Sequence, residues 1–76
     1  MAFAQNNEHL RAIADYDAAI ALSPAPYTFL NRGLAHRALG NLAQVKADLE
    51  VWVKVDPGWA PTVAAIDAAL KAQSGP

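Results

Sequence analysis

The chain has 76 residues, enough for one small domain, and a chain of this length buries only about 60% of the surface that its unfolded form exposes. It has no cysteine, which excludes a disulfide framework and a thiolate metal site, and its net charge of -1 with six scattered basic residues argues against a nucleic-acid partner. Because alanine supplies much of the 54% hydrophobic content, we expect an all-helical protein.

The first predicted helix covers residues 8–22. Its larger apolar residues recur at the spacing of one helix face: Ile13, Tyr16 and Ile20. The segment Ser23–Pro26 then ends the helix, because its two prolines cannot donate to the preceding turn and disfavour helical geometry in the residue before them. We expect a tight turn here.

The second helix is predicted over residues 26–39 and carries two sides suited to packing. At 100° per residue, one side holds Phe29, Gly33 and His36. The nearly opposite side holds Tyr27, Asn31, Leu34 and Ala38. Such a helix usually packs through one side and offers the other to a neighbour or a ligand. Gly40 and Asn41 follow, and these residue types favour a left-handed exit and a side-chain cap on the next helix.

The third helix is predicted over residues 42–55. Its apolar stripe consists of Leu42, Val45, Leu49, Trp52 and Val53. Asp56-Pro57-Gly58 ends this helix, and a last helix is predicted from about Pro61 to Ala72, within a capping segment of residues 59–73. The residues from Gln73 to Pro76 are expected to fray.

The first and third helices share a pattern that indicates an internal repeat. The matching positions, offset by 33 residues, are Ala12 with Val45, Tyr16 with Leu49 and Pro24 with Pro57. A fixed period near this length, with two helices per unit, is typical of a helical solenoid.

Residues 26–57 resemble one full unit of the tetratricopeptide repeat family, whose pattern is W-x2-L-G-x2-Y, then A-x3-F, then P. The positions that follow this spacing are Phe29, Arg32, Gly33, His36, Val45, Leu49 and Pro57. With residues 8–22 as the second helix of a truncated repeat and 59–73 as a capping helix, the resemblance covers nearly all the chain. It implies a short right-handed α-solenoid of about four helices that binds proteins and is not an enzyme. In this repeat the small residue Gly33 would let the partner helix approach closely.

The chain departs from the family pattern at several points. Arg32 replaces the usual leucine, His36 replaces the usual tyrosine, and the repeat is one residue short. Phe3 falls where the preceding repeat would have its first-helix tyrosine, so either the chain is a fragment of a longer array or its first helix starts early. Because one side of the first helix would then lack its usual cover, we hypothesise a homodimer, or a helix swap, through the N-terminal helix.

Several polar and aromatic residues are interpreted as structural. We expect Arg32 to pair with Asp15 or Asp48, since a charge at a helix interface is normally paired. We interpret His36 and Trp52 as packing residues. No third ligand accompanies the histidines and no phosphate loop or nucleophile motif occurs, so we predict no catalytic residue, no metal and no cofactor.

The candidate partner-binding surface is the exposed stripe of the second helix. It consists of Tyr27, Leu30, Asn31, Leu34, Arg37 and Ala38. In the resembled family the first helices of successive repeats line a concave groove, and Asn31 stands where peptide-binding members often carry an asparagine that contacts ligand backbone. The family's carboxylate-clamping basic residues have no counterparts, since Pro61 and Ala65 stand there instead.

The predicted partner is therefore a protein or peptide, and an alternative of similar weight is self-assembly of a larger repeat protein through the same stripe. No apolar run reaches the length of a membrane span, and the first seven residues lack the features of a signal peptide. We expect a soluble chain without membrane contact, with the cytoplasm slightly favoured.

Overall fold

The computed structural model describes residues 2–74, with side chains described for residues 7–73. Within them lie four α-helices and one short 3₁₀ helix. Their bounds are α1 (Ala2–Leu22), α2 (Pro26–Leu39), α3 (Leu42–Trp52), η1 (Pro57–Trp59) and α4 (Ala60–Ser74). The prediction of an all-α fold is confirmed.

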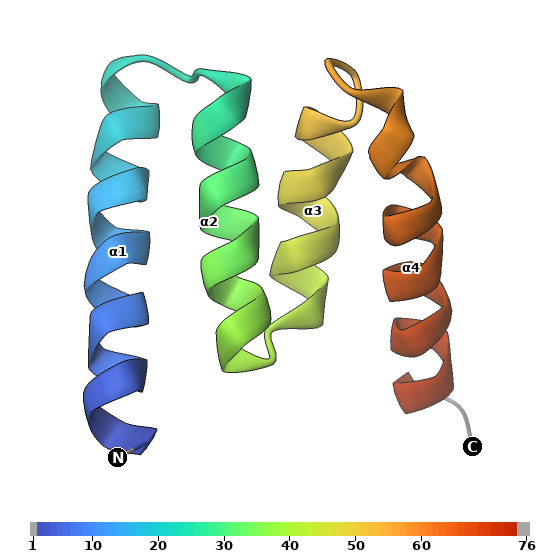
Figure 1. Ribbon diagram of the computed structural model, residues 1–76, viewed down its shortest axis with the longest axis horizontal. Helices are drawn as coiled ribbons and strands as arrows, with labels where there is room; N and C mark the ends of the chain where they lie inside the picture. Colours follow the sequence, from blue (N-terminus) through green and yellow to red (C-terminus); the bar gives the residue numbers. More distant parts are fainter. Residues whose placement is uncertain (1, 75–76) are drawn as a thin grey trace.

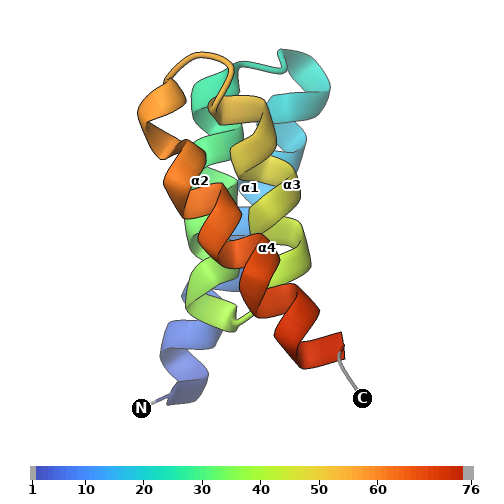
Figure 2. The same ribbon diagram turned by 90° about the vertical axis from the view of Figure 1, so that its right-hand side faces the viewer.

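The helices stand side by side in chain order and alternate in direction, which produces an open row (Figure 1). The main packing joins α1 with α2, α2 with α3, and α3 with α4. Figure 2 shows α4 inclined relative to α2 and α3 at the end of this row. The resulting body measures 34 × 33 × 18 Å, so it is flat and leaves both broad faces of the row open.

The turn between α2 and α3 forms where it was predicted. Gly40 adopts φ +79°, and its N–H donates to the carbonyl of Arg37 while that of Asn41 donates to the carbonyl of His36. The predicted side-chain cap by Asn41 is wrong for the described structure. The Asn41 amide instead lies 3.3 Å from Nδ1 of His36, one turn back along α2.

The outer helix ends differ from those predicted. α1 begins at Ala2 rather than Glu8, because residues 2–7 contain no glycine or proline to interrupt it. The early start was one of the two open explanations, although the side chain of Phe3 lies outside the described side chains.

At the other end of the chain, α3 stops at Trp52 rather than Val55, since two β-branched valines and the approaching Pro57 favour a turn there. α4 begins at Ala60, one residue before the predicted Pro61. It includes Gln73 and Ser74, which were expected to fray, whereas Gly75 and Pro76 lie outside the described residues.

The core is small and centred on α3. Val45, Leu49 and Ile66 form its buried centre, and Leu30, Leu42, Trp59, Val63 and Leu70 pack against them. Gly33 of α2 is buried against α3, and an added Cβ would lie 3.1 Å from the Cβ of Asp48. The prediction that Gly33 allows close approach of the next helix is therefore confirmed.

Candidate functional site

The predicted stripe on α2 divides into an exposed part and a packed part. Leu30 packs against the core and is not available to a partner, because it lies on the flank of the stripe that turns toward Gly33. The remaining residues, named here the α2 stripe, are Tyr27, Asn31, Leu34, Arg37 and Ala38. Tyr27 is 62% exposed and Leu34 38% exposed, and Asn31 is half-buried between them.

One end of the α2 stripe is held by an aromatic pair. The rings of Tyr27 and Trp52 meet edge to face, with centroids 6.4 Å apart and planes at 73°. Trp52 is half-buried, in keeping with its predicted packing role, and its Nε1 finds no acceptor within the described part of the chain. The exposed Tyr27 ring thus contacts the half-buried Trp52 ring of α3.

Arg32 joins three helices beneath the opposite side of α2. Its Nε and Nη2 donate to the two carboxylate oxygens of Asp48 at 3.0 and 2.8 Å, and its Nη1 donates to Asp17 at 2.8 Å. Its guanidinium carbon also lies 5.2 Å from the centroid of the Phe29 ring. The hydrogen bonds that Arg32 donates to Asp48, and then the one that it donates to Asp17, raise the pKa of Arg32, which therefore stays charged.

Asp48 is one of the two partners predicted for Arg32, and only 1% of it is exposed. The other predicted partner, Asp15, is exposed, and Asp17 takes its place. The reason is helical geometry: Asp15 and Asp17 lie about 200° apart around α1, so only one of them can face α2. His36, also predicted to pack, is half-buried and contacts Asn41.

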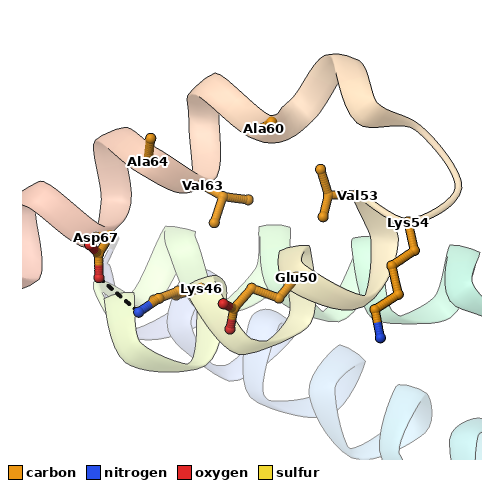
Figure 3. Close-up of a pocket in the computed structure, with 8 residues that line it drawn as sticks. All are labelled: Lys46, Glu50, Val53, Lys54, Ala60, Val63, Ala64 and Asp67. Carbon is orange, nitrogen blue, oxygen red and sulfur yellow. Dashed lines mark hydrogen bonds and ion pairs between the residues drawn. The ribbon is translucent and has the colours of Figure 1, made fainter.

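A groove between α3 and α4 was not predicted (Figure 3). It encloses about 530 Å³ and is lined by Lys46 and Glu50 of α3, by Val53 and Lys54 of the turn that follows α3, and by Ala60, Val63, Ala64 and Asp67 of α4. Val53 and Val63 extend into it from opposite sides. Its floor is thus apolar and its edges are charged.

An ion pair closes one end of the groove. Lys46 Nζ lies 2.7 Å from Oδ1 of Asp67, and Lys71 Nζ lies 3.1 Å from Oδ2 of the same carboxylate. The bonds from Lys46 and then Lys71 lower the pKa of Asp67, and the Asp67 carboxylate raises the pKa of Lys46. This end therefore carries no uncompensated acid.

The repeat offset shows which larger residues of α2 correspond to the small groove residues of α4. Moving 33 residues along the chain takes Tyr27 to Ala60 and Asn31 to Ala64. Two small side chains on α4 thus stand where α2 carries larger ones, and the space beside α3 stays open. The sequence could have indicated this difference, because alanines occupy the positions of Tyr27 and Asn31 one repeat later, although no motif marks them.

Comparisons with protein-family models, with curated proteins and with solved structures found no match. Among the described residues, no group of three or more histidine, cysteine or acidic residues is placed to hold a metal ion. None of the helices between residues 2 and 74 combines the length and apolar character needed to cross a bilayer. The α2 stripe and the groove between α3 and α4 are therefore the two surfaces from which a function can be inferred.

Proposed function

We propose that this chain is a protein-interaction module of the tetratricopeptide repeat type, with residues 26–57 as its full repeat in a short right-handed solenoid. In this proposal it holds a peptide or a helix of a partner protein along the α2 stripe and has no chemistry of its own. The observation that carries the proposal is the exposure of Tyr27 and Leu34, which lie about one helical turn before and after Asn31.

The chemistry of the α2 stripe suits a peptide. Tyr27 and Leu34 offer apolar area, and a tyrosine side chain has few rotatable bonds whose freedom is lost on binding. Asn31 can both donate to and accept from a peptide backbone, because its amide carries both kinds of group. Arg37 is exposed at the edge and forms no ion pair within the described part of the chain, so it favours an acidic residue on the partner.

The proposal is tested by selecting peptides from a displayed random library on the wild-type chain and measuring their affinity by fluorescence anisotropy. Leu34→Glu and Asn31→Glu should each weaken a selected peptide by about thirtyfold, the effect of losing a central contact worth ~2 kcal/mol. Val55→Glu is the matched control, since it also places an acid on an exposed apolar residue but lies outside the stripe. Equal loss in all three variants would contradict the proposal.

The alternative function is self-assembly through the same stripe, as a segment of a larger scaffold or a homo-oligomer. The two functions separate when the mass of each variant is measured by light scattering. Loss of peptide with unchanged mass supports partner binding, whereas a mass altered by Leu34→Glu supports assembly through the α2 stripe.

A further inference from the structure

Two pairs of opposite charges, one on α1 and one at the end of α3, form no close ion pair in the described part of the chain. Glu50 and Lys54 edge the groove between α3 and α4, and Arg11 and Asp15 lie on the exposed outer side of α1. None of the four forms an ion pair within residues 7–73. In each pair the two residues are four positions apart in the sequence, and the charges of the two pairs follow in opposite order along the chain. Arg11 and Asp15 lie one turn apart on α1, whereas Glu50 lies on α3 and Lys54 in the turn directly after it.

Apolar groups accompany both pairs. On α1, Leu10 is 55% exposed and Ala14 is exposed beside it, next to Arg11 and Asp15. These residues lie away from the side of α1 that packs on α2. In the groove, Val53 and Val63 form an apolar floor and Ala60 leaves room above it (Figure 3). The groove and the outer side of α1 therefore both combine apolar groups with a pair of opposite charges.

We propose that the outer side of α1 from a second copy of this chain docks in the groove between α3 and α4. The docked helix runs parallel to α3, so that its Arg11 faces Glu50 and its Asp15 faces Lys54. Because the charges of the two pairs follow in opposite order along the chain, a parallel approach allows both contacts. The reverse orientation would bring like charges together, so the charges select one direction.

The proposed contact joins two different surfaces. Copies joined in this way either exchange their α1 helices reciprocally, as a closed dimer, or continue into a ring or chain. The contact leaves the α2 stripe outside the interface, so it is independent of the proposed peptide binding. It also covers Leu10, which the fold itself leaves exposed.

Charge reversal tests the contact, with the dissociation constant of self-association measured by sedimentation. Asp15→Lys and Lys54→Glu should each weaken association by about three- to tenfold, as expected for exposed pairs turned repulsive. The double variant restores an attractive pair and should return to within about twofold of the wild type. Gln44→Glu adds an acid on the side of α3 away from the groove and should leave association unchanged.

Two results would overturn the proposal. One is a wild-type chain that stays monomeric up to about 1 mM, where even weak specific association is half complete. The other is a double variant that associates no better than the weaker single variant. Far-ultraviolet circular dichroism of each variant confirms that the helices are retained, so a loss of association is not a loss of folding.

Cross-linking locates the contact directly. Because the chain has no cysteine, an Ala14→Cys chain mixed with an Ala60→Cys chain should form a mixed disulfide under mild oxidation. An Ala14→Cys chain mixed with a Gln44→Cys chain should not. Equal cross-linking in both mixtures would place the association elsewhere and contradict docking in the groove.

Discussion

Replacement of Arg32 by methionine should destabilise the protein strongly. The change removes a guanidinium and leaves the carboxylate of Asp48, whose side chain is 2% exposed, without its cation. Leaving one member of a buried pair in this way costs ~3 kcal/mol or more. For a domain of this size, each kcal/mol lowers Tm by about 4–8 °C, so we expect a fall of at least about 12 °C.

The assay is thermal and urea unfolding followed by circular dichroism, with three companion variants. Asp17→Asn should cost less than ~1 kcal/mol, since 56% of the Asp17 side chain is exposed and its pair is screened by water. Asp15→Asn should lie within ~0.5 kcal/mol of the wild type. A variant with both Arg32→Met and Asp48→Leu should recover most of the lost stability, because the buried charge is removed together with its partner.

These results would also fix the role of Arg32. At temperatures where the Arg32→Met variant remains folded, its affinity for a selected peptide should match the wild type. An Arg32→Met variant within ~1 kcal/mol of the wild type would refute the reasoning from burial. So would an Asp15→Asn variant that is less stable than Asp17→Asn.

Three further predictions concern single positions, each measured by urea unfolding. Gly33→Ala should be destabilised by about 1 kcal/mol, because a crowding cost of about 1–3 kcal/mol against Asp48 exceeds the helix-propensity gain of about 1 kcal/mol. An increase in stability would show that α3 moves away from the added methyl group at little cost. Gly40→Ala should lower the free energy of unfolding by about 1–2 kcal/mol, because alanine is strained in the left-handed conformation of residue 40, and Gly40→Asn should lower it less. Equal losses in the two variants would argue against a conformational cause. Because Lys46 and Lys71 lower the pKa of Asp67, the stability that this carboxylate contributes is complete above about pH 4 and is lost as pH falls through its folded-state pKa. Asp67→Asn should therefore flatten the acid limb of a stability–pH curve, and an unchanged limb would mean that other carboxylates govern it.

The sequence predicts the central helices well because their ends depend on local backbone chemistry. Pro26 and Gly40 bound α2 where expected, since proline fixes a first turn and glycine allows the left-handed exit. The end of α3 was placed too late because Val53 continues the apolar stripe while the backbone has already turned. Periodicity describes which side chains face the core, and it does not locate the last hydrogen bond.

The site was less predictable because it depends on relations between helices. Asp15 and Asp48 are equivalent in the repeat, yet only Asp48 pairs with Arg32, since the approach of α1 to α2 presents Asp17 instead. Leu30 was predicted to belong to the exposed stripe from its angular position on the helix, but in the structure its side chain packs against the core. The groove between α3 and α4 is lined in part by small side chains, Ala60 and Ala64. Alanines carry no functional group, so the sequence alone did not point to a site there.

The neighbour-to-neighbour packing of the row has a consequence for how the chain opens. α1 and α4 each pack mainly on one helix, whereas α2 and α3 are each flanked by two. Amide hydrogen exchange should therefore be fastest in the terminal helices and slowest around Val45 and Leu49, as a gradient rather than a single global step. Since these contacts join helices that are consecutive in the chain, the chain is also expected to fold rapidly, outward from the hairpin of α2 and α3.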